Sequence, residues 1–463
     1  MAIVPSFVGL CLLLLVGHAL RTRVRLVQKL YLPSAVIGGL VGLAAVQLLV
    51  GEGKAVSPMW IAGWERLPGF LINIVFACLF LGVRLPKVST IWARAGHQVV
   101  YGQLVAWGQY VVGVGLVVLW LGGLFGLPDM FGGVLPVGFE GGHGTASGLA
   151  ETFEKLGWAA GKDFALASAT GGIISAIVVG MMLINWAARR GHTVRRLSPA
   201  DVPEDDSIGI IPVDRRPSAG RLTVRSDSIE SFTLHVAIVG LAVALGYVLK
   251  QGLVALEALV APEAEQSFME SFPLFPLCML GGLVVQILEE KFDRHKLLDV
   301  GLTRRIQNSA LDFLVVAAIA TINLQVIGAG WLPLVVLIAA GVLWNVFCLL
   351  VLAPRLLPDA WFERAIAEMG QSMGVTATGL LLLRVVDPDY ESPAADAFAC
   401  KQLVHEPFLG GGLWTSTAIP LLYFWGGPTV LAIAAGAVAF WFVVACLARL
   451  ARRRGGAAQD GPP

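Results

Sequence analysis

The chain contains a series of apolar stretches, each about 20 residues long and with few or no charged residues. A stretch of this kind is long enough to cross the hydrocarbon core of a bilayer as an α-helix. Of the 463 residues, 56% are apolar and 14% are charged, whereas a soluble protein carries roughly 25% charged residues. The runs do not alternate as the strands of a membrane barrel do. The sequence therefore predicts an all-α polytopic membrane protein that has the lipid bilayer as its surroundings.

The expected membrane helices fall into two groups of five, followed by one more. Their approximate ranges are 4–20, 32–50, 68–83, 99–124 and 163–187, then 232–250, 272–289, 308–327, 331–353 and 397–424, and finally 429–449. Positive charge follows the first run and does not precede it, which indicates an uncleaved helix and not a signal peptide. The excess of Lys and Arg on alternate sides places the N-terminus outside and the C-terminus in the cytoplasm.

The long polar segment 188–230 divides the chain. It is rich in arginine and proline, which indicates a basic cytoplasmic linker between a first membrane repeat, 1–187, and a second, 231–425. Residues 426–463 are expected to form an extra C-terminal helix and a basic tail. No basic patch with interleaved aromatic residues suggests a nucleic-acid partner. The short loops suit the plasma membrane of a bacterium, that is, its inner membrane.

Two polar, Gly-rich segments interrupt the apolar pattern at matching places in the two halves. Residues 145–149 read Thr-Ala-Ser-Gly-Leu and residues 376–380 read Thr-Ala-Thr-Gly-Leu. We expect each segment to lie in a re-entrant hairpin, at about 126–157 and about 366–390. Five crossings precede the linker, so the second half has the opposite orientation to the first. Two inverted five-helix repeats with interrupted helices are typical of a transporter that binds its substrate near the midplane of the membrane.

Irregular backbone at membrane depth is tolerated where it lines a watery cavity or is buried in protein. Free N–H groups at a helix break favour a carboxylate or another anion, and hydroxyl and carbonyl oxygens suit sodium. The alternative is a turn of closely packed helix, since small residues also serve packing in membranes. The candidate substrate-binding residues are Glu140, Gly141, Gly142, His143, Gly144, Thr145, Ser147, Gln371, Ser372, Gly374, Thr376 and Thr378.

Other polar residues in apolar stretches are further candidates. Asn308 and Asp312 share one helix face with Ser309 beside them, and the three provide oxygen ligands for an ion or cap the start of a helix. Glu140 and Glu406 are candidates for coupling. An intramembrane enzyme that uses His143, His405 and Glu406 is an alternative of another class, although the second His of a zinc-protease motif is missing. We expect sodium as the only metal, no transition-metal site and no other cofactor.

Gly-Gly-His-Gly-Thr at 141–145 resembles the sodium/glutamate symporter family. The segment 31–40 and the pair Asn308-Ser309 also resemble that family, and the similarity extends over roughly residues 1–425. The resemblance implies a secondary active transporter with two inverted repeats, a re-entrant hairpin in each, a homodimer and sodium-driven uptake of an acidic amino acid. It also implies elevator-like alternating access.

Two features depart from the family pattern. Glu140 stands where a small polar residue is usual, and Thr376-Ala377-Thr378 replaces a Thr-Pro-Thr-like string. A carboxylate at 140 would repel an anionic substrate unless it is protonated, paired or bound to a cation. We therefore expect sodium-coupled symport of a small organic anion, glutamate or a related acidic amino acid, with a proton-coupled transporter of another carboxylate as the alternative.

Overall fold

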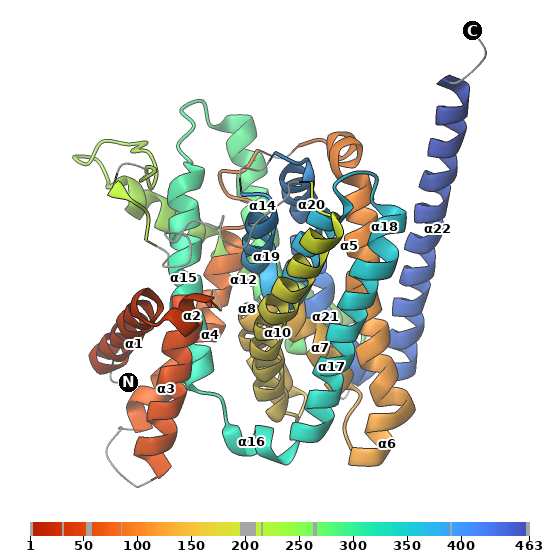
Figure 1. The fold of residues 1–463 in the computed structure, drawn as a ribbon. Helices are drawn as coiled ribbons and strands as arrows, with labels where there is room; N and C mark the ends of the chain where they lie inside the picture. Colours follow the sequence, from red (N-terminus) through yellow and green to blue (C-terminus); the bar gives the residue numbers. More distant parts are fainter. Residues whose placement is uncertain are drawn as a thin grey trace.

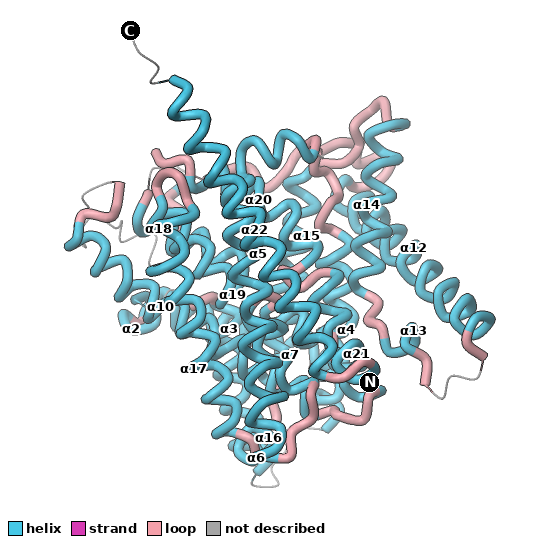
Figure 2. Tube along the Cα trace, turned by 90° about the vertical axis from the view of Figure 1, so that its right-hand side faces the viewer, coloured by secondary structure: helices cyan, strands magenta, loops and turns pink. Residues whose placement is uncertain are grey.

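The computed structural model describes residues 3–29, 32–51, 58–84, 86–194, 210–213, 216–262, 266–388 and 391–459. Within these ranges every regular element is a helix, and no strand occurs (Figures 1 and 2). Seven of the described helices are long and apolar enough to cross a membrane. The prediction of an all-α polytopic membrane protein is therefore confirmed. The inverted five-helix repeats and the re-entry of each hairpin at one membrane face stay predictions.

The helices of the first half are α1 (Ile3–Arg23), α2 (Arg25–Lys29), α3 (Ser34–Gly51), α4 (Pro58–Ala77), α5 (Val88–Leu116), α6 (Gly122–Phe125), α7 (Met130–Phe139), α8 (Gly142–Gly148), α9 (Ala150–Lys155) and α10 (Ala160–Arg190). The second half contains α12 (Ser231–Val260), α13 (Phe268–Ser271), α14 (Phe275–Phe292), α15 (Val300–Ala320), α16 (Leu324–Ala329), α17 (Trp331–Phe347), α18 (Ala353–Leu356), α19 (Trp361–Val386), α20 (Ala394–Phe408), α21 (Leu413–Phe424) and α22 (Gly427–Gln459). A π-helical turn extends both α5 and α17.

The central core is built around α7, in which every residue is buried. Small residues allow the backbones of its neighbours to come close, as in other membrane helix pairs. A Cβ on Gly132 of α7 would lie 2.6 Å from Cα of Val114 on α5. A Cβ on Gly172 of α10 would lie 2.3 Å from the carbonyl oxygen of Met373 on α19. The first interrupted segment is thus enclosed by α5, α10 and α19.

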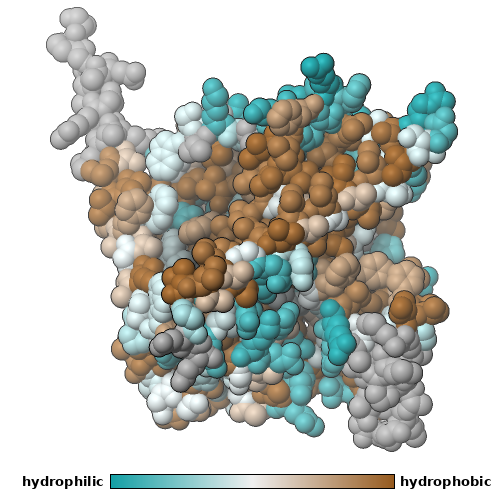
Figure 3. All heavy atoms as spheres, turned by 180° about the vertical axis from the view of Figure 1, so that it is seen from behind, coloured by the Kyte–Doolittle hydropathy of each residue, from teal (hydrophilic) through white to brown (hydrophobic). Residues whose placement is uncertain are grey.

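The remaining helices surround this core. The helices α1, α3 and α15 lie on one side, and α22 stands at the opposite edge and packs along α5 (Figure 1). Large apolar side chains on α22 are exposed, among them Phe440, Val443 and Leu447. Figure 3 shows a hydrophobic belt over one face, with hydrophilic side chains gathered at its upper edge. Such a surface is suited to contact with lipid.

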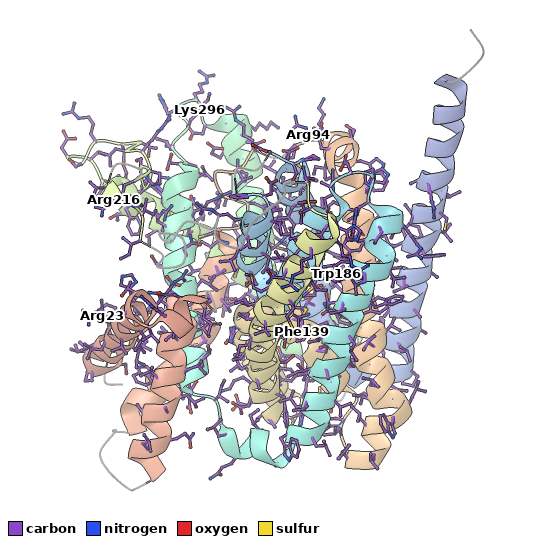
Figure 4. The ribbon with its side chains drawn as sticks, viewed as in Figure 1. Arg23, Arg94, Phe139, Trp186, Arg216 and Lys296 are labelled. Carbon is purple, nitrogen blue, oxygen red and sulfur yellow. The ribbon has the colours of Figure 1, made fainter. Side chains whose placement is uncertain are left out.

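Basic residues from separate loops and helix ends gather at one end of the molecule. Arg94, Arg216 and Lys296 lie toward the end at which α22 finishes (Figures 1 and 4). This is the grouping that the positive-inside rule predicts. That this end faces the cytoplasm, with the N-terminus outside, stays a prediction.

Several predicted helix bounds were wrong. Helix α4 begins at Pro58 instead of 68, α5 at Val88 instead of 99, and α15 at Val300 instead of 308, while α12 continues to Val260. Trp64, which lies between the predicted helices 32–50 and 68–83, is buried in α4 and donates a hydrogen bond to the Ser6 carbonyl oxygen at 2.9 Å. Charged residues near the ends make these segments less apolar than the helix centres. Each helix continues beyond its apolar part, because backbone hydrogen bonds form whether the side chains are apolar or charged. A C-terminal helix beyond 425 is present as α22.

Candidate functional site

The first interruption lies between α7 and α8, at Glu140–Gly142. The N–H groups of Glu140 and Gly141 both point to the carbonyl oxygen of Pro136, at 2.9 and 3.3 Å. Gly142 then takes a φ of +63°, which a residue without Cβ adopts readily. Phe139, the last residue of α7, lies near the middle of the molecule's height in Figure 4. The break is therefore placed deep inside the protein.

The second interruption lies within α19, at Gly374 and Val375. Val375 has a φ of +64°, which is strained for a β-branched residue. Before and after this point the two arms lie against each other, because a Cβ on Gly370 would be 2.7 Å from Cα of Gly379. In a continuous helix these residues, nine positions apart, would be separated by about 13 Å. The sequence echo thus marks a second place where the chain reverses.

The tips of the two interruptions touch each other. A Cβ on Gly142 would lie 2.4 Å from Cγ1 of Val375. Two segments separated by more than 200 positions in the sequence therefore meet in the interior. The sequence predicted that the two tips meet around one site, but it did not specify Gly142 and Val375 as the residues in contact.

Glu140, at the first tip, is buried and bound on three sides. Its Oε2 accepts hydrogen bonds from Nε2 of Gln371 at 2.8 Å and from Nε2 of His405 at 3.1 Å. Its Oε1 accepts one from Nε2 of Gln109 at 3.3 Å, and the same amide nitrogen donates to the Ser372 carbonyl oxygen at 2.7 Å. The carboxylate therefore joins the first tip to α5, α19 and α20. This pairing is one of the conditions under which a carboxylate next to an anion site is tolerated.

A second buried charge lies beside this network. Nζ of Lys401 on α20 lies 2.6 Å from Oε1 of Glu368, and both side chains are fully buried. The same Nζ donates to the side-chain oxygens of Gln371 and Gln402, each at 3.0 Å. Sequence reasoning missed Lys401 and Glu368. A lysine inside the apolar run 397–424 was the available signal, since such a residue in a membrane helix is costly unless it is paired.

A third interruption separates α20 from α21, so the prediction of one continuous helix over 397–424 was wrong. Pro407 lies in the last turn of α20, and Gly411 takes a φ of +94°. The Gly411 carbonyl oxygen accepts hydrogen bonds from Oγ1 of Thr145 at 3.4 Å and from Oγ of Ser416 at 3.1 Å. This break therefore brings carbonyl and hydroxyl oxygens against the first Gly-rich segment.

The other residues of the first segment have separate partners. Nε2 of His143 lies 2.9 Å from Oγ1 of Thr170, whose hydroxyl donates to the Leu166 carbonyl oxygen, so His143 is the donor of the pair. A Cβ on Gly144 would contact Ile72 of α4 at 3.1 Å. The hydroxyl of Ser147 is buried and has no partner among the described residues. His143 is thus held at α10, whereas His405 is held at Glu140.

The model of the sodium/glutamate symporter family matches residues 1–391. The chain belongs to the sodium/glutamate symporter family. No curated protein matches its sequence. Membership implies sodium-coupled glutamate symport by a multi-pass membrane protein, and the family resemblance is confirmed for these residues. The match ends before α20, so the break at Gly411 and the side chains of Lys401 and His405 lie outside it.

In this symporter the second segment is linked to α20 as well. Nε2 of Gln402 donates to Oγ1 of Thr376 at 2.5 Å, and Oγ1 of Thr378 donates to the Gly374 carbonyl oxygen at 2.5 Å. These hydroxyls stabilise the second arm of α19 directly after its break. Glu406, the other predicted coupling residue, is half-buried on the same helix.

The predicted ion ligands on α15 lie apart from the polar network. Asn308, Ser309 and Asp312 are exposed on this helix. Their neighbour Leu311 faces the first segment, since its Cδ1 would lie 3.9 Å from a Cβ on Gly144. No ligand role is demonstrated for the three residues, and their assignment to an ion site stays a prediction.

A cavity of about 450 Å³ reaches the first segment from the surface. It is bordered by α4, α9, α12 and the start of α14, and it includes the buried Ser147 of α8. Near its mouth, Nζ of Lys155 lies 2.8 Å from a carboxylate oxygen of Glu151 and donates to the Glu270 carbonyl oxygen at 3.1 Å. The cavity therefore connects the protein surface with Ser147, which lies in α8 directly after the first interruption.

Proposed function

We propose that this chain carries out sodium-coupled symport of glutamate or a related acidic amino acid. The observation that supports this most strongly is the meeting of three interrupted helices in the interior, with Gly142, Val375 and Gly411 at the three breaks. Interrupted helices at this depth expose backbone N–H and C=O groups to a bound anion and cation. A single Gly-rich turn that served only helix packing would not require three breaks to converge.

The substrate site is proposed at the two tips, from Gly141 to Thr145 and from Ser372 to Thr378. N–H groups at the start of α8 and of the second arm of α19 favour the carboxylates of an acidic amino acid. His143 adds a side-chain donor on the α10 side of the first tip. Glu140 is directed to His405 and Gln371, so its carboxylate oxygens are hydrogen-bonded by partners within the protein.

The sodium site is proposed at the third break. Thr145 Oγ1, Ser416 Oγ and the Gly411 carbonyl oxygen are hard oxygen atoms of the kind that sodium prefers. Both hydroxyls lie within hydrogen-bonding distance of that carbonyl oxygen. Because Thr145 also belongs to the first tip, an ion held here would order the substrate site. Asn308, Ser309 and Asp312 remain the candidates for a second ion position on α15.

Transport is proposed to follow an elevator-like mechanism in a homodimer. α6 and α18, which precede the two interrupted segments, lie at opposite ends of the molecule (Figure 1). This arrangement supports entry of the hairpins from opposite membrane faces. The interrupted helices and α20 are linked through Glu140 and Gln371, which favours their movement as one body.

A proton is the second candidate coupling ion. Glu140 and Glu368 carry two negative charges, and Lys401 supplies one positive charge. The buried network is therefore neutral only when His405 is protonated or another cation is present. This observation favours a proton-coupled transporter of another carboxylate as the alternative to the sodium symporter.

Uptake into proteoliposomes distinguishes these possibilities. Radiolabelled glutamate is supplied with an inward sodium gradient, with a proton gradient, or with neither. We expect accumulation driven by sodium and abolished by Thr145→Ala, whereas Thr321→Ala, which removes a hydroxyl bonded within α15, serves as the matched control. Accumulation that follows the proton gradient alone would favour the second candidate, and absence of coupled flux for any carboxylate in folded protein would contradict the transporter.

A further inference from the structure

Three side-chain oxygens converge on the ammonium of Lys401. They are Oε1 of Glu368, of Gln371 and of Gln402, at 2.6, 3.0 and 3.0 Å. We call these three oxygens the cation cage. Lys401 and Glu368 are fully buried, and Gln371 and Gln402 are buried as well. One carboxylate and two neutral amide oxygens around a positive charge are the kind of ligand set that also suits a hard monovalent metal ion.

The orientation of both amides is fixed by their other ends. The NH₂ group of Gln371 donates to Glu140, and that of Gln402 donates to Thr376. Their oxygens must therefore face Lys401, because amide oxygen and nitrogen have opposite hydrogen-bonding roles. The ammonium of Lys401 has three N–H donors, and each of these three oxygens accepts one of them. The cage thus has the character of a cation site and connects directly to both Gly-rich segments.

Helix α5 is shaped to leave room for the cage. A Cβ on Gly102 would lie 2.5 Å from Oε1 of Glu368 and 2.5 Å from Cε of Lys401. One turn earlier, Gln98 donates to the other carboxylate oxygen of Glu368 at 2.8 Å. Each carboxylate oxygen of Glu368 therefore accepts a hydrogen bond, one from Lys401 and the other from Gln98.

We propose that Lys401 is a resident cation that occupies a monovalent-cation site next to the two tips, and that its removal makes this site available to sodium. The lysine ammonium then performs the neutralising role of an ion without being transported. This inference rests on the proposed function only where it concerns the coupling of transport. Cation binding in the cation cage can be measured whether or not the chain transports a substrate. Lys401 is outside the residues matched by the family model, so the family assignment does not supply this role.

Cation binding to purified protein in detergent tests the proposal without transport. The variants are Lys401→Ala, which empties the cage, and Lys401→Gln, which leaves a neutral oxygen in it. Apparent Tm is measured from 0 to 100 mM NaCl, with choline chloride as the ionic-strength control. We expect either variant to gain a sodium-dependent rise in Tm of about 3 °C or more over the response of the parent protein. Adding Glu368→Gln should abolish that gain, since it removes the charged ligand.

Lys155→Ala is the matched control, because Lys155 is also paired with a glutamate but is partly exposed. It should leave the sodium response unchanged. A folded Lys401→Ala or Lys401→Gln variant without additional sodium response would overturn the proposal. A double variant, Lys401→Met/Glu368→Gln, removes both buried charges. If it folds while neither single variant folds in sodium or in choline, the proposal also fails, because sodium is then unable to replace the ammonium. If the parent protein transports nothing, the proposed function fails, and the binding result still stands.

Discussion

Gly142 and Val375 lie tip to tip, and both have a positive φ, of +63° and +64°. A Cβ on Gly142 would lie 2.4 Å from Cγ1 of Val375. The glycine is therefore required twice, for its backbone conformation and for the space that its missing side chain leaves.

Gly142→Ala should lower the rate of glutamate uptake by about tenfold or more, because the new methyl group separates the tips and a barrier change of about 1.4 kcal/mol corresponds to a factor of ten. Gly126→Ala is the matched control, since Gly126 has the same φ of +63° and no atom within 4 Å of a new Cβ. Adding Val375→Ala should partly restore uptake. Equal loss in the two single glycine variants would show that backbone strain, and not the contact, is responsible.

Glu140 and His405 should be energetically coupled. Removing one partner of a buried hydrogen bond costs about 1–3 kcal/mol, because the other polar group is left unsatisfied. Glu140→Gln and His405→Gln together should destabilise the protein by about 1–3 kcal/mol less than the sum of the single changes. Thermal or denaturant unfolding of the four proteins gives this coupling energy. Strict additivity would contradict the observed pairing at 3.1 Å.

The sequence was sufficient to locate the two Gly-rich interruptions, because Thr145 to Leu149 and Thr376 to Leu380 repeat one pattern within apolar surroundings. It was not sufficient to find their partners. His405 is 265 positions from Glu140, and no local pattern connects them. The break at Gly411 had a local signal in Pro407 and in the three glycines 410–412, but one helix was still predicted over 397–424.

Position-dependent packing also explains the errors in helix bounds. Trp64 lies in the segment that the apolar pattern left between the predicted helices 32–50 and 68–83. In the structure this residue is 6% exposed, and its indole N–H donates to the Ser6 carbonyl oxygen. Contacts between α4 and α1 decide the environment of this residue, and these contacts are a property of the folded chain.

Gly370→Ala should destabilise the protein by about 1–3 kcal/mol, because the methyl group would contact the backbone of Gly379 at 2.7 Å and separate the arms of α19. Gly328→Ala on α16 is the control. It has open space around a new Cβ and gains up to about 1 kcal/mol of helix propensity. Thermal unfolding should therefore shift in opposite directions for the two variants. A similar shift for both would contradict the close approach of the arms.

Asp293 lies in the loop between α14 and α15, outside the membrane-spanning segments. Slight burial opposes ionisation, but the N–H groups of Leu297, His295 and Lys296 outweigh this and lower the pKa of the carboxyl. Because the folded pKa is below the ordinary value, the stabilisation is complete above the ordinary pKa and is lost as pH falls through the lower folded value.

Asp293→Asn should accordingly increase hydrogen exchange of residues 293–299 at neutral pH, while the difference from the parent protein disappears in acid. Asp227→Asn is a suitable control, since the carboxylate of Asp227 is exposed and pairs with the exposed Arg225. A difference that grows as pH falls would have the wrong sign for this account.

The most direct test of the central claim is the reciprocal dependence of sodium and glutamate binding in purified protein. Glutamate affinity is measured as a function of sodium, and sodium affinity as a function of glutamate, for the parent protein, Thr145→Ala and Ser416→Ala. If the tips and the third break form one site, each ligand should increase the affinity of the other by the same factor, about 5- to 150-fold. Both variants should reduce that factor toward one. Glutamate binding that is independent of sodium in the parent protein would contradict the account.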